Sequence, residues 1–419
     1  MAELLPASPA SVRASDYNPL APEVRADPYP YYAALRRESP VHQSIPGLPF
    51  FAVSRYADVM HVLHHPELFS STALQILGQS GTGFGPNGGA LGGHRLIESA
   101  MMIAVDPPDH TRLRTLVARG FTPRRIAALE PRIRELAARF LDEALPAGRM
   151  DLVRDFAIPL PVTVIAELLG IEPERHEQFK HWSDAIVIGL SGVGGEFSRD
   201  DVVRAADEMA EYFERMVAER RARPREDLLS VLIQAEQGDA LATGEVLSFV
   251  FLLLIAGNET TTNLIGNATR ALLAHPAALA QVEADPSLIP GLLEETLRYD
   301  SPIQGIPRKV MADVELAGTK LPKDAFAMVL FASANRDEAQ FPEPDRFDIH
   351  RNPQGHVAFG HGIHFCLGAA LARLEARVAF EELLPRCRRL RLEGEEIPLI
   401  DSALLRGPKS LPLGFEPVV

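Results

Sequence analysis

Cysteine is scarce in this sequence. The 419 residues contain two cysteines, Cys366 and Cys387, and they do not form a Cys-x-x-Cys pair. Such a chain cannot build the disulfide framework on which small secreted proteins depend, so we expect it to reside in a reducing compartment. Without a second closely spaced pair of ligands, the two cysteines also give little support for a structural zinc site.

The chain also lacks an excess of positive charge and a long apolar run. The formal net charge of −14 argues against nucleic-acid binding as the main role. The longest apolar run lies around 246–256, which is too short to span a bilayer, and residues 1–20 hold no apolar core of signal-peptide length. We therefore expect a soluble, cytoplasmic protein.

Hydrophobic periodicity predicts a fold that is mainly α-helical with a small β portion. Residues 1–25 are rich in proline and alanine and are predicted to form a loosely ordered arm, followed by a single domain over 26–419. The glycine-rich stretch 78–93 is either a lid over a ligand or a plain linker, and we favour the lid because structured pattern resumes on both sides. Helices are predicted over 31–37, 57–63, 126–145, 162–169, 179–190, 201–223, 244–274 and 292–299, and strands over 50–54, 314–316, 326–330 and 413–415.

The segment around Cys366 is the clearest candidate for a site. A glycine-rich loop over 359–365 leads to Cys366, and an apolar stripe at helical spacing follows over 367–378 until Pro385. A cysteine at the start of a helix faces free amide groups and the positive end of the helix dipole, so we expect a lowered thiol pKa and a metal-binding thiolate. Gly368 leaves space for a flat, bulky group against the backbone.

Three interpretations of Cys366 are open on this segment alone. An isolated cysteine is most often a buried core residue. Zinc is a second interpretation, since His361 and His364 lie close by, but Cys387 brings no matching set of ligands. The third is haem held by a proximal thiolate.

A resemblance supports the third interpretation. The segment resembles the cytochrome P450 signature Phe-x-x-Gly-x-x-x-Cys-x-Gly, and every fixed position is filled. The resemblance implies haem b, bound against Phe359 and Gly368 with Cys366 on the metal. Four further stretches resemble family motifs, in family order over about 26–419, and this agreement removes the zinc interpretation.

One of these stretches lies in the helix predicted over 244–274, which is apolar nearly all round at its start and should be buried. Polar residues and a glycine inside a buried helix are costly and need a reason. The Thr260 hydroxyl can bond back into the helix and open a groove, and Glu259 offers a proton. The stretch resembles the family's oxygen-activation motif, which implies that Glu259 and Thr260 deliver protons and that Ala256 and Gly257 lie against the haem.

Basic residues are assigned by the same resemblance. His110 and Arg114 share one face of a predicted helix, which taken alone is better interpreted as a solvated face. The resemblance implies that both residues bind the haem propionates, together with Arg308 and His364.

Two further groups follow from the resemblance. Glu295 and Arg298 match its Glu-x-x-Arg pair, and Arg346 of the later Pro-Asp-Arg-Phe stretch is expected to complete a buried charge cluster. The substrate pocket is expected to include Ile303, Ile306 and Leu404, and to be apolar.

The sequence thus predicts a cytochrome P450 fold in which a long distal helix and the cysteine loop enclose haem. The expected reaction inserts one oxygen atom of O2 into an apolar substrate, and the long predicted lid leaves room for a bulky one: a fatty acid, terpenoid, steroid or polyketide. The chain contains no flavin- or nicotinamide-binding segment, so the resemblance implies a ferredoxin and its reductase as electron donors. The alternatives are a peroxide-driven peroxygenase and a non-catalytic haem sensor. A ferredoxin is expected to dock on Arg112, Arg119, Arg373 and Arg377.

Overall fold

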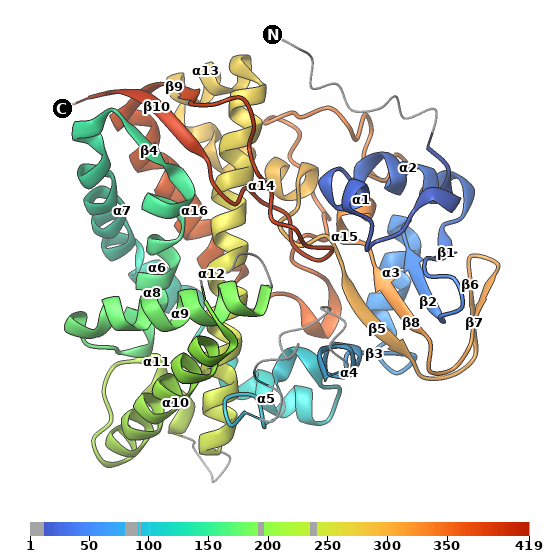
Figure 1. The fold of residues 1–419 in the computed structure, drawn as a ribbon, viewed down its shortest axis with the longest axis horizontal. Coiled ribbons are helices and arrows are strands. Elements are labelled where there is room, and N and C mark those ends of the chain that lie inside the picture. Colours follow the sequence, from blue (N-terminus) through green and yellow to red (C-terminus); the bar gives the residue numbers. More distant parts are fainter. Residues whose placement is uncertain are drawn as a thin grey trace.

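The structure is a computed structural model that describes residues 12–79, 91, 94–99, 101–191, 197–234 and 241–418. Helices make up most of it, and Figure 1 shows the strands in two places: β4, β9 and β10 lie at the upper left, and the other strands lie at the right. The helices are α1 (Pro22–Ala26), α2 (Tyr29–Glu38), α3 (Tyr56–His64), α4 (Ala73–Gln79), α5 (Asp109–Ala118), α6 (Pro123–Ala128), α7 (Glu130–Ala144), α8 (Pro159–Leu169), α9 (His176–Ser191), α10 (Arg199–Ala222), α11 (Leu228–Ile233), α12 (Thr243–Ala274), α13 (Pro276–Ala284), α14 (Ile289–Tyr299), α15 (Phe331–Ala334) and α16 (Ala369–Arg386).

The largest sheet joins strands from residues 41–70 to strands from residues 306–329. Its five strands have the order β1-β2-β8-β5-β3, with β2 and β8 parallel and the other pairs antiparallel. A second sheet has the order β4-β10-β9, and β6 pairs with β7 alone. The strands are β1 (Val41–Gln43), β2 (Phe50–Val53), β3 (Phe69–Ser70), β4 (Arg149–Asp151), β5 (Ile306–Val310), β6 (Val314–Leu316), β7 (Thr319–Leu321), β8 (Phe326–Val329), β9 (Cys387–Leu392) and β10 (Pro412–Pro417).

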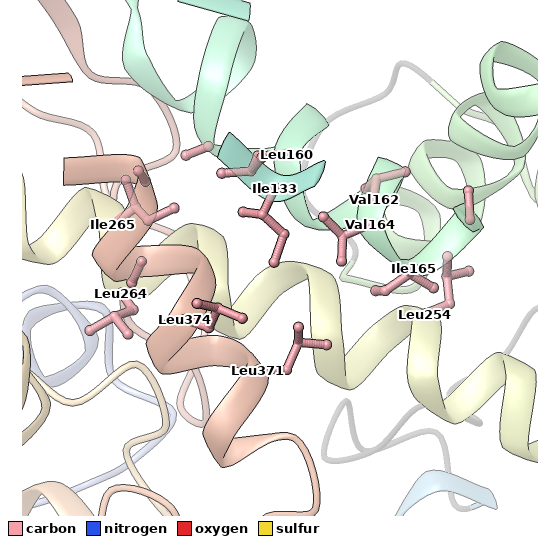
Figure 2. Packing of buried hydrophobic residues seen from close by; sticks show 14 of the residues in the cluster. Ile133, Leu160, Val162, Val164, Ile165, Leu254, Leu264, Ile265, Leu371 and Leu374 are labelled. Atoms are coloured by element: carbon pink, nitrogen blue, oxygen red, sulfur yellow. The ribbon is translucent and has the colours of Figure 1, made fainter. Parts of the chain in front are cut away.

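Helix α12 passes through the middle of the molecule (Figure 1). It is long and apolar enough to cross a membrane by length and composition, but 61% of its most apolar window is buried inside the protein, as expected of a core helix. Leu254 and Ile265 of α12 lie among Ile165 of α8 and Leu371 and Leu374 of α16 (Figure 2). Fully burying one such side chain contributes about 1.5–3 kcal/mol, so this packing holds α8 and α16 against α12.

Two predicted helix boundaries are wrong. The single helix predicted over 126–145 is divided into α6 and α7, because Pro131 in the first turn of α7 has no amide hydrogen with which to continue the preceding helix. The helix predicted to begin at Cys366 begins at Ala369 and extends through Pro385. The predicted strands correspond to β2, β6, β8 and β10, whereas β1, β3, β4, β5, β7 and β9 were not predicted.

The predicted N-terminal arm lies partly outside the described residues, which begin at position 12. From there on it is packed rather than loosely ordered: a single turn at Ala14–Asp16 and α1 bury Ala14, Tyr17 and Val24. Most of the predicted lid over 78–93 lies outside the described residues, so the lid stays a prediction.

Candidate active site

Cys366 lies in a loop that folds back on itself. Its amide donates to the Phe359 carbonyl at 2.9 Å, which closes the loop. Gly360 and Gly362 have φ of 70° and 69°, in the left-handed region that favours glycine. A Cβ at Gly362 would also lie 2.7 Å from the carbonyl oxygen of Leu63, so any larger residue there would push α3 away from the loop.

The thiol of Cys366 does not have the lowered pKa that the sequence predicted. Burial is the largest influence and raises its pKa, whereas the amides of Gly368 and Ala369 and the charges of Arg114 and Arg373 act in the opposite direction. Because α16 begins only at Ala369, Cys366 stands before the helix rather than in its first turn. A bound metal cation would therefore be needed to hold this sulfur as a thiolate.

Four basic side chains from separate elements gather beside the loop. The rings of His110 on α5 and His364 in the loop have centroids 4.2 Å apart. Burial, and then repulsion by Arg308, His110 and Arg114, lowers the pKa of His364 to about 3. Arg308 of β5 is buried, and burial lowers its pKa to about 10. The structure thus brings together all four residues predicted to bind propionates.

Among the described residues this basic cluster forms no ion pair, and the one carboxylate whose charge acts on Arg308 and His110 is Asp106. Arg308 donates only to the carbonyl of its neighbour Pro307, and neither it nor Arg114 forms an ion pair with a described carboxylate. The buried Nε2 of His110 has no hydrogen-bond partner. The nearby Asp106 is engaged by the hydroxyl of Ser70 and the amide of Ser71. A buried arginine without an ion-pair partner is costly, so the cluster fits the two carboxylates of a haem.

Apolar surface next to the loop fits the flat ring of the same group. Phe365 is 41% exposed, and Ala256 is exposed although it lies within the buried helix α12. A Cβ at Gly368 would meet no atom within 4 Å. The donor set of a thiol, four basic groups and an open apolar face is therefore suited to haem b.

The polar stretch of α12 has the expected local geometry at Thr260. The Thr260 hydroxyl donates to the Ala256 carbonyl at 2.6 Å, the predicted bond back into the helix. Burial raises the pKa of Glu259 to about 7. The contact of Gly257 with the haem stays a prediction; on its Cβ side this residue meets α8, because a Cβ there would lie 2.8 Å from Cδ1 of Ile165. This glycine therefore permits close helix packing.

The predicted charge cluster is present, but its third member is wrong. Glu295 and Arg298 are fully buried and paired at 2.7 Å. The second arginine on Glu295 is Arg351, whose Nε lies 3.2 Å from Oε1 and whose side chain is 12% exposed. The side chain of Arg346 is 58% exposed and pairs with Glu343 and Asp348.

The path of the backbone explains why Arg351, rather than Arg346, reaches Glu295. Arg298 already holds the carbonyl oxygens of Pro344 and Arg346, so the chain at Arg346 presents its backbone to the cluster and its side chain to solvent. The amide of Asp348 donates to Glu295, and the chain turns there. The side chain of the next arginine, Arg351, therefore points toward the Glu295 carboxylate. Spacing in the sequence gave no reason to prefer Arg351 over Arg346.

The residues predicted for the substrate pocket come from two segments that meet. The amide of Gln304 donates to the carbonyl of Leu404 at 2.7 Å, and Ile303 pairs with Leu405. Ile303, Ile306 and Leu404 are each half-buried, so part of each side chain is accessible. The pocket assignment stays a prediction.

The arginines proposed for ferredoxin docking are largely paired. Arg112 contacts Glu245. Arg373 pairs with Glu294 at 2.6 Å, and Arg377 pairs with Glu130 and Glu381 at 2.7 and 2.8 Å. Three of the four predicted docking residues would thus share their charge with carboxylates of the same chain.

Comparisons with known proteins agree with these features. The family model described as "Cytochrome P450" matches residues 287–415. The chain is 42% identical over 395 residues to Cytochrome P450 107B1 of Saccharopolyspora erythraea, which covers 91% of this chain and 93% of that protein. It is 42% identical over 417 residues to Cytochrome P450 monooxygenase PikC of Streptomyces venezuelae, an alignment that covers 96% of this chain and 95% of that protein. It is 41% identical over 397 residues to Vitamin D(3) 25-hydroxylase of Pseudonocardia autotrophica, an alignment that covers 93% of this chain and 94% of that protein.

Solved structures give the same result. Cytochrome P450 CYP109Q5 from Chondromyces apiculatus superposes with a TM-score of 0.88 at 44% identity, covering 97% of this chain and 99% of that chain. CYP109E1 from Bacillus megaterium in complex with corticosterone gives a TM-score of 0.83 at 36% identity, covering 94% and 100%.

Proposed function

The chain belongs to the cytochrome P450 family, whose members bind haem b through a cysteine thiolate, and we propose that it hydroxylates or epoxidises an apolar, bulky substrate with Cys366 as the axial ligand. In the hydroxylation, a C–H compound, O2, two electrons and two protons give an alcohol and water. When bound, the haem supplies the iron at which O2 is reduced. The observation that carries the proposal is the Cys366 loop beside two arginines and two histidines that form no ion pair with a described carboxylate.

The basic cluster would fix the cofactor by its propionates. His110, Arg114, Arg308 and His364 come from α5, β5 and the cysteine loop, so a dianionic group between them would also tie these elements together. Hydrogen bonds to charged groups contribute about 1.5–3 kcal/mol each, which suits a cofactor that must stay bound.

Glu259 and Thr260 of α12 would handle a proton for the reaction. A carboxyl with a pKa of about 7 is partly protonated at neutral pH and can give up a proton readily. The presence of this acid–alcohol pair favours O2 and supplied electrons over the peroxide-driven alternative. We place the protein in the cytoplasm, with a ferredoxin and its reductase as donors.

A steroid-like polycyclic compound is our first choice among fatty acids, terpenoids, steroids and polyketides. The choice is supported by the names of similar proteins, a vitamin D(3) hydroxylase and a structure that holds corticosterone. The half-buried Ile303, Ile306 and Leu404 offer apolar contacts without a charge, as such a substrate requires.

The ligand can be tested by the difference spectrum of the reduced protein with and without carbon monoxide. Wild type should give the strongly red-shifted Soret band of a thiolate, and Cys366→His should lose it while keeping its fold by circular dichroism. An imidazole-like band in folded wild type would contradict the assignment of Cys366.

The reaction can be tested with a surrogate ferredoxin, its reductase and a panel of steroids, terpenoids, fatty acids and macrolides under ¹⁸O2. Product carrying one labelled oxygen supports monooxygenation, and the compound that is turned over fixes the substrate class. Product formed only with added peroxide would favour the peroxygenase alternative.

A further inference from the structure

A buried polar cluster joins the two segments that supply the residues predicted for the substrate pocket. One segment follows α14 and leads into β5, and the other is the loop over 402–407. The amide of Arg406 donates to the Pro302 carbonyl at 2.8 Å. The amide of Gln304 donates to the Leu404 carbonyl at 2.7 Å. These backbone bonds hold one segment against the other.

The side chains of Asp300 and Arg406 connect the same two segments. Nε of Arg406 donates to Oδ1 of Asp300 at 2.9 Å, and the two side chains are 9% and 11% exposed. The Asp300 carboxylate also accepts from the Tyr29 hydroxyl at 2.9 Å and from Arg270 at 3.1 Å. Burial raises the pKa of Asp300, but the charges of Arg406 and Arg270 outweigh burial and leave the pKa below its ordinary value. The carboxylate is therefore charged at neutral pH and is held by three donors.

Helix α12 binds this ion pair from the face that carries Thr260. Asn267 is fully buried, and its Nδ2 donates to the carbonyl of Asp300 at 3.0 Å and to that of Arg406 at 2.9 Å. Asn267 follows Thr260 by about two helical turns, so both residues lie on one face of α12. A Cβ at Gly407 would collide with a side chain of α12, so the loop lies directly on this helix.

Apolar side chains beside the ion pair are placed toward the cofactor site. On β5, Ile306 stands two residues before Arg308, so both side chains project from the same face of the sheet. Arg308 belongs to the basic cluster beside the cysteine loop, which directs Ile306 toward the same space. Ile303 and Leu404 each stand within three residues of the ion pair in the sequence. A shift of either segment would therefore move the apolar residues offered to a substrate.

We propose that Asp300 and Arg406 are positioning residues that decide which carbon of the substrate is oxidised. They act by holding Ile303 and Leu404 at a fixed place relative to the Thr260 face of α12. A misplacement of about 1 Å can change a rate by about a hundredfold, so a small shift of either segment favours attack at a different carbon. The inference rests on the proposed function, because it requires an apolar substrate bound in that pocket.

Hydrogen–deuterium exchange of the haem-loaded protein tests the anchoring without turnover. In Asp300→Asn and in Arg406→Gln, peptides that cover 300–306 and 402–407 should exchange at least about tenfold faster than in wild type. Tyr29→Phe removes one hydroxyl from the carboxylate and should give a smaller increase, so it serves as the test if a stronger variant does not fold. Wild-type exchange in the folded variants would overturn the proposal.

The matched control breaks a buried ion pair elsewhere in the fold. Asp227 pairs with Arg220 of α10 at 2.6 Å, and the two side chains are 7% and 1% exposed. Asp227→Asn should lower the stability of the protein but leave the exchange of both peptides and the products unchanged. If this control speeds exchange in the two peptides as much as Asp300→Asn does, the effect is global and the proposal is overturned.

The distribution of products tests the positioning itself. The probe is the compound of the steroid, terpenoid, fatty-acid and macrolide panel that wild type oxidises fastest. In Asp300→Asn and Arg406→Gln the ratio of oxidised positions should change by about tenfold. Arg406→Lys, which keeps a positive charge beside the carboxylate, should restore most of the wild-type ratio.

Two outcomes separate positioning from stability and from the proposed function. An unchanged product ratio together with a lower yield of folded protein would mean that the ion pair only stabilises the fold, which would overturn the proposal. If wild type oxidises no compound of the panel, the proposed function fails and the claim about products fails with it. The exchange data then still decide whether the ion pair anchors the two segments.

Discussion

Replacing Arg351 with alanine should destabilise the protein, whereas the same change at Arg346 should have little effect. Arg351 Nε donates to the fully buried carboxylate of Glu295 at 3.2 Å. A hydrogen bond to a charged group contributes about 1.5–3 kcal/mol. The pairs of Arg346 lie on the surface, where such interactions contribute about 0–1 kcal/mol. We therefore expect a difference of about 2 kcal/mol between the two variants.

Urea unfolding of the haem-loaded protein, followed by far-ultraviolet circular dichroism, measures this difference. Arg351→Lys should give an intermediate loss, since it keeps the charge but not the planar fork. Glu295→Gln should cost more, about 3–5 kcal/mol, because it leaves the buried Arg298 charge without its carboxylate. Equal losses at Arg351 and Arg346, or a larger loss at Arg346, would refute the assignment of Arg351 to the cluster.

Arg308→Gln should speed haem transfer to excess apomyoglobin by about tenfold, with Arg308→Lys intermediate, because one charged contact to a propionate is lost. Gly257→Ala should change the free energy of unfolding by less than about 1 kcal/mol, because the better helix propensity of alanine offsets the cost of displacing the tip of the Ile165 side chain. The Soret band should stay in place, and a shifted band would place Gly257 at the haem. Wild type should lose stability relative to Glu259→Gln as pH rises from about 4.5 to about 7, because a raised pKa favours the folded state only while the acid is protonated; parallel pH profiles would contradict this. Thr260→Ala should keep substrate binding but divert electrons to peroxide, and unaltered coupling would count against its role.

The parts of the fold that depend on local pattern could be predicted from the sequence. The apolar surface of α12 and the periodicity of α10 gave helices within a few residues of the observed bounds. The bond from Thr260 to the Ala256 carbonyl could also be predicted, because it stays within one helical turn. Membership of the family, suggested by five ordered motifs, is confirmed by the comparisons.

Properties that depend on contacts between distant segments could not be predicted. Gly257 faces Ile165, and Arg351 rather than Arg346 reaches Glu295, because of how whole helices and turns are placed. The thiol pKa of Cys366 is raised rather than lowered because burial, which the sequence does not reveal, outweighs the nearby amides.

The distribution of charge around the site links cofactor binding to folding. On one side Arg114 and Arg308 keep their charge without described carboxylate partners. On the other, burial raises the pKa of Glu259 to about 7 and that of Glu375 to about 8, so both acids carry less negative charge at neutral pH than exposed glutamates do. The propionates of a bound haem would supply negative charge to the two arginines. A ligand that binds only the folded state stabilises it by mass action, so α5, β5 and the cysteine loop should gain most from haem.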